Sequence, residues 1–306
     1  MDRSLEGPIV VTRKRSTRRW RVDRFLPAFM LAPAVLVLAA LTLFPIGYVI
    51  YLSLTDTGVN SPNGSFIGLD NFRLIKDDPA FWDSVRVTGL FTGGAVLAEF
   101  VLGFAIALLL NGKMRGLGLL RTLMLLPMVM TPVIVALTWR MLYGPTYGYF
   151  DYLLSRLGLG QPNWLDNSRL ALVSVIAVDV WQWTPFMFLL LTAGLQSMPT
   201  EPFEAARVDG AGRLATFRHL TLPLMRNIII IALIFRAIDA FDTFDIIWVL
   251  TNGGPGTTTQ TLTIYSYFQS FRWFNFGYGA ALSVVMLVVV AVFCAIMVLL
   301  MNRETA

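Results

Sequence analysis

The segment 201-EPFEAARVDGAGRLATFRHLTLP-223 places a run of charged residues between two long apolar stretches of the chain. Thr200 is a favoured N-cap residue, and a proline and two glutamates fall in the first turn after it, where both residue types are favoured. Gly210 can end the helix, because helices commonly end on a left-handed glycine. The pattern predicts one short helix up to Gly210 and a second at about 213–220, which leads to Pro223.

The composition of the chain is that of a membrane protein. Of its 306 residues, 56% are hydrophobic and 14% are charged, whereas soluble domains are about 25% charged. Apolar runs of about 20 residues can cross the hydrocarbon core, and their backbone groups must be bonded within the segment, which implies helices. The alternation typical of β-barrel strands is absent. We predict an all-α polytopic membrane protein with six transmembrane helices, at residues 25–54, 87–110, 119–143, 170–196, 227–250 and 279–301.

Lysine and arginine residues fall mainly on one side of these spans. The basic segment 1–24 holds eight of them, and more lie in the second–third loop (Lys113, Arg115), the fourth–fifth loop and the tail (Arg303). Fewer lie on the other side, among them Arg73, Lys76, Arg156, Arg169 and Arg272. The positive-inside rule therefore predicts cytoplasmic termini, including a short tail at 304–306. We assign the basic balance to topology and anionic lipid rather than to nucleic acid. The first apolar run is too long for a signal-peptide core, so an uncleaved anchor is expected.

Metal and disulfide chemistry has little support in the sequence. The chain has one cysteine, Cys294, and one histidine, His219. A single cysteine excludes an intrachain disulfide and a Cys-rich metal site, and a single histidine leaves no partner for a histidine cluster. We therefore expect no metal site.

The charged segment also carries a family pattern. Glu204-Ala205-Ala206, then Gly210 four residues on, then Leu220-x-Leu222-Pro223 resembles the EAA loop of bacterial ABC importer permeases. The stretches 66-FIGLDNF-72, 181-WQWTPFMFLLLTAGLQSMP-199 and 241-FDTFDIIWVLTNGGPGTTTQTLTIYSYFQSF-271 are similar to the carbohydrate-uptake subgroup, which includes maltose-type and glycerol-3-phosphate-type permeases. The similarity spans roughly residues 26–303. The enteric maltose permease carries extra N-terminal spans and a large external domain. The first predicted external loop of this chain, at 55–86, is short, so we expect the compact six-span form.

The resemblance implies a type I ABC importer permease fold over residues 25–303, with a coupling loop at about 198–223. In such importers two permease subunits form the pathway, and each inserts its EAA helix into a cleft of one cytoplasmic ATPase subunit. The residues implied in coupling are Glu204, Ala205, Ala206, Asp209 and Gly210.

The same resemblance implies the partners and the location. We expect a second, homologous permease, a dimer of ABC ATPase subunits, an extracytoplasmic solute-binding protein and a sugar or sugar derivative, in the bacterial cytoplasmic (inner) membrane. The chain contains no G-x-x-x-x-G-K-[ST] motif. ATP and magnesium are therefore expected at the partner ATPase, with no cofactor on this chain, which is a transporter subunit and not an enzyme.

Charged residues inside the predicted spans are the candidate pathway residues. Charge at mid-membrane is costly, so such side chains usually face a protein interior or a wet cavity. Arg236 and Asp239 can form an ion pair at i, i+3. The residues that we predict to line the substrate pathway are Asp179, Trp181, Gln182, Asp239, Asp242, Phe244, Asp245 and Asn252. The alternative is structural, with Arg236, Arg140, Asp179, Asp239 and Glu99 forming ion pairs that hold the helices and the partner permease together.

Several alternatives remain open at this point. The turn-rich stretch 251-TNGGPGTTTQT-261 is either a flexible connector or a docking or gating element on the external side. The solute can be a neutral, phosphorylated or sulfonated sugar, or no sugar at all. Two other classes of function, a secondary transporter driven by an ion gradient and an intramembrane enzyme, leave the EAA pattern without a role.

Overall fold

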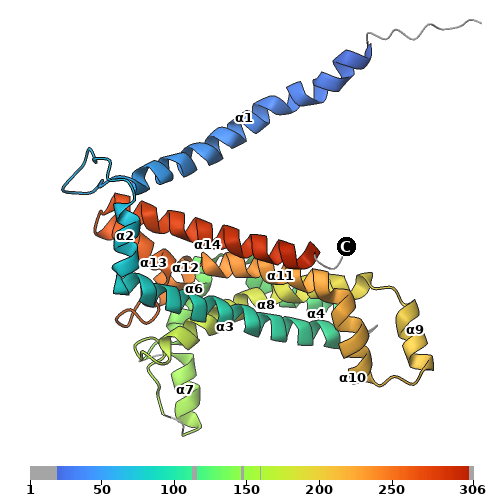
Figure 1. Cartoon of the computed structure of the whole chain (residues 1–306). Coiled ribbons are helices and arrows are strands. Elements are labelled where there is room, and N and C mark those ends of the chain that lie inside the picture. Colours follow the sequence, from blue (N-terminus) through green and yellow to red (C-terminus); the bar gives the residue numbers. More distant parts are fainter. Residues whose placement is uncertain (1–18, 112–115, 146–147, 159, 303–306) are drawn as a thin grey trace, which may run out of the picture. The chain divides into compact units, whose positions relative to one another are not determined.

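The structure is a computed structural model that describes residues 19–111, 116–145, 148–158 and 160–302 (Figure 1). The predictions for most of the basic segment 1–24, for Lys113 and Arg115, and for the tail from Arg303 concern residues or side chains outside this described part. The chain divides into two units, with the boundary between Tyr51 and Leu52.

Helix α1 (Arg19–Ser53) makes up the whole described part of the first unit and extends two residues beyond its boundary. Its Phe29–Ser53 portion is long and apolar enough to cross a membrane. The side chains described along this portion are mostly exposed, as expected for a helix whose natural solvent is lipid. The first predicted span is therefore confirmed as a helix.

The second unit is helical in every regular element that the structure describes, and no strand is assigned among those residues. Its helices are α2 (Asp70–Asp77), α3 (Pro79–Leu109), α4 (Leu117–Met124), α5 (Leu126–Val129), α6 (Pro132–Leu142), α7 (Tyr149–Arg156), α8 (Ala171–Ser197), α9 (Glu201–Val208), α10 (Arg213–Thr216), α11 (Leu222–Phe241), α12 (Asp245–Thr251), α13 (Leu262–Tyr267) and α14 (Phe276–Asn302). Two π-helical turns, Phe217–Thr221 and Phe268–Arg272, follow α10 and α13.

Five helices in the described residues are long and apolar enough to span a membrane. Those of the second unit are α3, α8, the continuous stretch Arg213–Phe241 and α14. Helix α3 begins earlier than predicted, at Pro79, because the Asp78 side chain accepts a hydrogen bond from Ala80 N at 2.9 Å and caps the helix.

The third predicted span, 119–143, is wrong as a single helix. The chain there forms the three shorter helices α4, α5 and α6, and only α6 is a longer apolar helix, too short to count among the five. Proline lacks a backbone N–H and forces the preceding residue toward extended backbone. Thr131, before Pro132, accordingly has a ψ angle of 137°. The count of six spans therefore remains a prediction.

The fifth predicted span, 227–250, is also wrong in its bounds. The helix starts at Arg213 and runs without a break to Phe241, so the separate short helix predicted at about 213–220 is its first part. A π-helical turn, in which Leu222 N bonds to Phe217 O, lies directly before Pro223 and accommodates the missing N–H of the proline. The helix then breaks at Asp242–Phe244 and resumes as α12.

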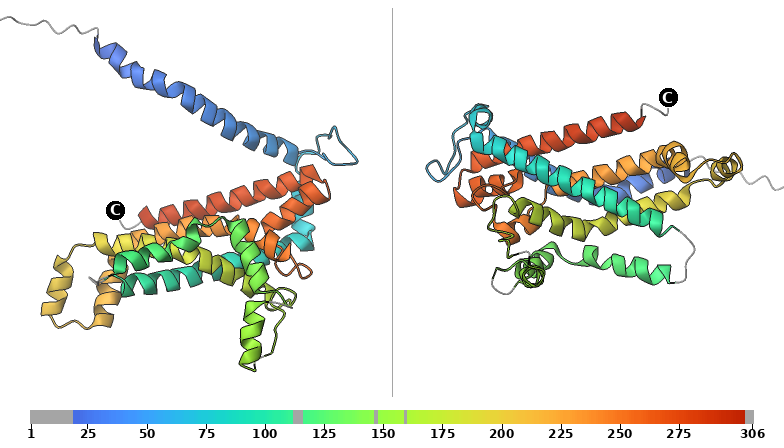
Figure 2. Two further views of the ribbon diagram at one scale, coloured as in Figure 1. Left: turned by 180° about the vertical axis from the view of Figure 1, so that it is seen from behind. Right: turned by 90° about the horizontal axis from the view of Figure 1, so that it is seen from below.

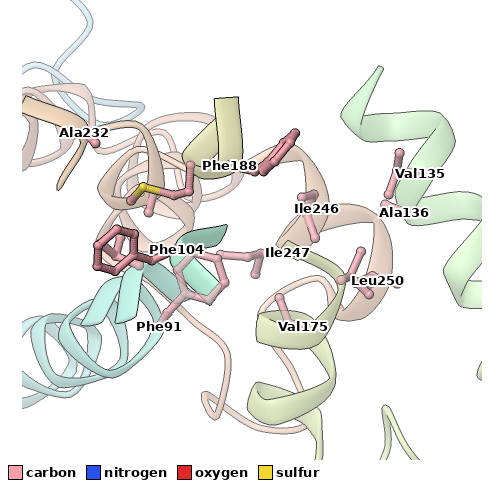
Figure 3. Packing of buried hydrophobic residues seen from close by; sticks show 14 of the residues in the cluster. Phe91, Phe104, Val135, Ala136, Val175, Phe188, Ala232, Ile246, Ile247 and Leu250 are labelled. Atoms are coloured by element: carbon pink, nitrogen blue, oxygen red, sulfur yellow. The ribbon is translucent and has the colours of Figure 1, made fainter. Parts of the chain in front are cut away.

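Buried apolar side chains of α3, α6, α8, α11 and α12 form the main core of the second unit. Ile246, Ile247 and Leu250 of the short helix α12 lie between Val175 of α8 and Ala136 of α6 (Figure 3). The packing of α12, which follows the helical break at Asp242–Phe244, therefore holds the break in place.

Gly103 allows α3 and α8 to approach closely. A Cβ at this position would lie 2.7 Å from Met187 Cβ and 2.9 Å from Phe188 N, distances that force the helices apart. We expect Gly103→Leu to lower the melting temperature of the detergent-solubilised protein and its level in membranes. Gly93→Leu on the same helix is the matched control, because a Cβ there meets nothing within 4 Å. Equal melting temperatures for the two variants would contradict this close packing.

The second unit has two distinct ends (Figures 1 and 2). Helices α9 and α10 lie at the end where α3 and α14 finish, and α2, α12 and α13 lie at the opposite end. The EAA segment and the 251–261 stretch therefore occupy opposite ends of this unit.

Candidate functional site

The EAA segment folds as α9 and a tight turn. Thr200 precedes the first helical residue, as predicted, but its side chain makes no capping hydrogen bond. Gly210 has a φ of +75°, and its N–H bonds to Arg207 O at 3.2 Å, while Ala211 N bonds to Ala206 O at 2.9 Å. These two bonds form a Schellman motif, which requires the left-handed conformation that glycine adopts without strain.

Helix α9 contains no buried residue. Glu204, Ala205 and Asp209 are exposed, and the apolar side chains Val208 and Leu214 are 88% and 78% exposed. A short helix with small and apolar residues open on its surface has the features of an element that docks into a groove of another protein.

A buried charge cluster joins three helices of the second unit. Arg236 of α11 is 1% exposed, and its Nε lies 2.6 Å from Oε2 of Glu99 on α3. Its Nη2 donates to Glu99 Oε1 at 2.9 Å and also pairs with Asp179 of α8. Its Nη1 lies 2.7 Å from Asp239 Oδ2, which is the ion pair expected from the i, i+3 spacing. The Trp183 ring lies 5.2 Å from the guanidinium carbon.

This cluster, defined as Arg236 with Glu99, Asp179 and Asp239, places a carboxylate oxygen close to each of the three guanidinium nitrogens. Glu99 and Asp179 have no exposed side-chain surface, whereas the Asp239 side chain is 53% exposed. The structure thus places Asp179 in the cluster. Arg140, which the structural alternative included, is elsewhere and donates to Val249 O at 3.1 Å.

A cavity of about 560 Å³ opens at the helical break between α11 and α12. Four of the predicted pathway residues line it: Asp239, Asp242, Phe244 and Asp245. The wall also contains Pro132, Trp183 and Thr243. The remaining lining residues are isoleucines and a phenylalanine. The break in the helix is what turns these side chains and backbone groups toward open space.

The other four predicted pathway residues, Asp179 of the charge cluster and three more, lie outside this cavity. Gln182 is fully buried, and its Nε2 donates to Met130 O at 3.0 Å. Trp181 makes an edge contact with Trp139, with ring centroids 5.6 Å apart. Asn252 has a φ of 51° and ends α12 in the left-handed conformation.

The 251–261 stretch is folded back on itself. The Thr259 hydroxyl lies 2.7 Å from the Thr251 hydroxyl and donates to Gly254 O at 2.8 Å. Thr259, Gln260 and Thr261 are buried, and a Cβ on Gly253 would lie 3.2 Å from Ile264 Cγ2. Of the two alternatives, these contacts favour an ordered element over a flexible connector.

A second cavity, of about 730 Å³, was missed by the sequence reasoning. It lies between the 56–61 loop, α2 and the stretch around α13, with Gln269, Trp273 and Asn275 on its wall. Asp78 Oδ2 accepts hydrogen bonds from the hydroxyls of Tyr265 and Tyr278, both at 2.5 Å. Burial acts to raise the pKa of Asp78, but these hydrogen bonds outweigh it and hold the pKa below its usual value. The only sequence signal was the Asp-Pro pair that starts α3.

No group of three or more His, Cys, Asp or Glu side chains within the described ranges is arranged to hold a metal ion.

This chain is similar to a known protein family and to several named proteins. The family described as "Binding-protein-dependent transport system inner membrane component" matches residues 99–304. The trehalose/maltose transport system permease protein MalF of Thermococcus litoralis is 38% identical over 86% of this chain and 89% of its own length. The trehalose transport system permease protein SugA of Mycobacterium tuberculosis is 37% identical over 90% and 88%, respectively.

A further relative and a solved structure extend the likeness. The sulfoquinovosyl glycerol transport system permease protein SmoG of Agrobacterium fabrum is 36% identical over 86% of each chain. A chain of a bacterial ABC transporter involved in the import of the acidic polysaccharide alginate superposes with a TM-score of 0.81, at 22% identity, and covers 94% of this chain and 100% of its own. This structural likeness shows the fold.

Proposed function

Because the chain belongs to the inner membrane components of binding-protein-dependent transport systems, we propose that it forms half of the translocation pathway of an ATP-driven sugar importer. The chain is an ABC permease subunit and not itself an enzyme. The observation that carries the proposal is the exposed EAA helix, joined by one continuous helix to a cavity with carboxylate and aromatic walls.

Sugar as the solute class has support from the relatives and from the cavity. Two of the similar permeases belong to transport systems named for trehalose or maltose. Carboxylates accept hydrogen bonds from sugar hydroxyls, and aromatic rings such as Trp183 and Phe244 pack on the apolar faces of sugars. A cavity of about 560 Å³ lies in the usual size range of small-molecule sites.

We assign the coupling role to Glu204, Ala205, Ala206, Asp209 and Gly210. Glu204 offers a carboxylate to a cationic partner, the alanines permit close approach, and Gly210 sets the turn that presents α9. Beyond this turn the helix Arg213–Phe241 has 29 residues, a length of about 44 Å at 1.5 Å per residue. A movement of α9 driven by an ATPase is thereby transmitted to the break at Asp242–Phe244, where the cavity opens.

The proposed partners are a second permease, a dimer of ABC ATPase subunits that holds ATP and magnesium, and an extracytoplasmic solute-binding protein. The proposed location is the bacterial inner membrane, with both termini and α9 in the cytoplasm. The ordered 251–261 stretch lies at the opposite end of the second unit from α9, and we assign it to docking or gating on the external side.

Gentle purification of the tagged chain from its native membranes tests the proposal, with mass spectrometry of the copurified proteins. One ATPase, a second EAA-bearing permease and a binding protein with a sugar ligand are expected. A binding protein loaded with another solute would replace the sugar class. Recovery of the chain alone, under conditions that keep a known ABC importer intact, would contradict the assembly.

Asp242→Ala tests the pathway assignment. The side chain is exposed in the cavity and makes no ion pair among the described residues, so its removal is expected to leave assembly intact. Loss of a hydrogen-bond acceptor for the solute is expected to lower uptake about tenfold, which corresponds to about 1.4 kcal/mol. Uptake kinetics and copurification of the partners are measured together, with Asp77→Ala, an exposed carboxylate outside the cavity, as the control. Unchanged apparent affinity and rate would assign Asp242 to a structural role.

A further inference from the structure

The charge of the cavity at the helical break bears on the solute. Its wall contains the three carboxylates of Asp239, Asp242 and Asp245, which are all exposed residues. None of the residues that line it within the described part of the chain is lysine or arginine. The fold itself does not decide the charge of the solute, since an importer of the acidic polysaccharide alginate shares it.

The nearest cation on the same helix is Arg236, and it is not available to a solute. Its three nitrogen atoms contact Glu99, Asp179 and Asp239, and the Trp183 ring lies 5.2 Å from its guanidinium carbon. The side chain is 1% exposed. The guanidinium is therefore buried and paired inside the protein, and it offers no free nitrogen to a solute in the cavity.

Arg140 does not belong to the wall of this cavity. It lines a different cavity, with Asn163 and Asp166, and donates to the carbonyl oxygen of Val249. A phosphate, sulfonate or carboxylate on a solute at the break between α11 and α12 would thus meet like charges, with no lysine or arginine among the described residues that line the cavity.

We infer that the solute passing this subunit is an uncharged saccharide or polyol, and that Asp239, Asp242 and Asp245 select against anionic sugar derivatives. The inference rests on the proposed function for its solute class. Hydroxyl groups donate to carboxylates, whereas an anionic group is repelled by them and gains nothing in return. A cavity lined by charges of one sign raises the local concentration of oppositely charged solutes and lowers that of like-charged solutes. The usual size of this effect in such clefts is about tenfold or more.

Charge-matched thiol reagents measure this field directly in the assembled complex. Thr243 lines the cavity, and Cys294 is the single native cysteine of the chain. Thr243→Cys in a Cys294→Ser background is labelled in detergent with cationic (trimethylammonium-ethyl) and anionic (sulfonatoethyl) methanethiosulfonates. Both rates are normalised to those of free 2-mercaptoethanol. We expect a preference of about tenfold for the cationic reagent beyond the free-thiol ratio. Replacing Asp239, Asp242 and Asp245 together by Asn is expected to bring the ratio back toward one.

A normalised ratio near one, unchanged by the Asn substitutions, would overturn the inference. Phe235→Cys, on the same cavity wall and 61% exposed, is the second reporter position. Failure of both cysteines to react would show that the cavity is closed to aqueous solutes, which also overturns it.

The ligand that copurifies with the binding protein gives an independent reading. An uncharged saccharide supports the inference, and a phosphorylated, sulfonated or uronic-acid saccharide overturns it. An uncharged solute of another class would contradict the proposed sugar function while leaving the charge selection intact. The labelling ratio does not depend on transport, so the two hypotheses can fail separately.

Discussion

Replacing Glu204 by Lys is expected to abolish ATP-driven uptake while the chain still inserts in the membrane and reaches its normal level. Glu204 is exposed on α9 and makes no ion pair among the described residues, so the folded chain itself loses little. A lysine there reverses the charge that the helix offers to its ATPase partner. Charge reversal in a protein interface commonly costs several kcal/mol, enough to remove most of the bound complex.

Gly210→Pro is expected to give the same loss for a different reason. Proline fixes φ near −65°, whereas Gly210 has a φ of +75°, and proline removes the N–H that bonds to Arg207 O. The Schellman turn is then lost, and α9 is no longer presented in one orientation. Transport in proteoliposomes, solute-stimulated ATP hydrolysis and membrane level are measured on the same preparations.

Two matched variants separate coupling from general damage. Gly212 has a φ of −68°, which proline adopts without strain, so Gly212→Pro is expected to retain most uptake. Asp77→Lys makes the same charge reversal at an exposed residue at the other end of the second unit and is expected to be neutral. Normal uptake by both Glu204→Lys and Gly210→Pro would remove the coupling role from this segment.

Arg236→Met is expected to destabilise the second unit strongly. The substitution leaves Glu99 and Asp179 without their counter-charge at positions where their side chains have no exposed surface. Breaking a buried ion pair by removal of one partner costs about 3–5 kcal/mol. We expect a clear drop in melting temperature in detergent and a lower level in membranes.

Neutralising the stranded carboxylates should reverse much of this loss. In the triple variant Arg236→Met with Glu99→Gln and Asp179→Asn no buried charge is left unpaired, and replacing a whole buried ion pair by neutral groups is often close to neutral. Arg169→Met, at an exposed arginine, is the control. The charge cluster does not hold α3, α8 and α11 together if Arg236→Met has the melting temperature of the wild type. The same conclusion follows if the triple variant has a lower melting temperature than the single variant.

The composition of each segment was enough to predict most of the membrane helices. Burial in lipid is a property of a run of about 20 residues and needs no knowledge of neighbouring helices. The spans at 25–54, 87–110, 170–196 and 279–301 accordingly appear as helices at these places. The turn at Gly210 was also readable locally, because few residues other than glycine adopt its backbone conformation.

The interruptions were harder to predict from sequence. Pro127 and Pro132 stand in the third predicted span and are a local signal for its division into α4, α5 and α6. Asp242, Thr243 and Phe244 carry no such signal. Their break is maintained by α12, whose apolar side chains pack between α6 and α8 (Figure 3).

The sequence by itself determined that this chain is a helical membrane protein with an EAA pattern between two apolar stretches, and it named the charged residues inside the spans. Apart from the i, i+3 pair Arg236–Asp239, only the tertiary structure decided which of them meet. Arg236 lies 137 residues from Glu99 and 57 from Asp179, and their contact depends on how α3, α8 and α11 are rotated and packed against one another. The same packing left Asp242 and Asp245 facing open space and buried Gln182. Insertion in lipid is decided along one segment at a time, whereas partners of buried charges are decided between segments, and no local pattern records that choice.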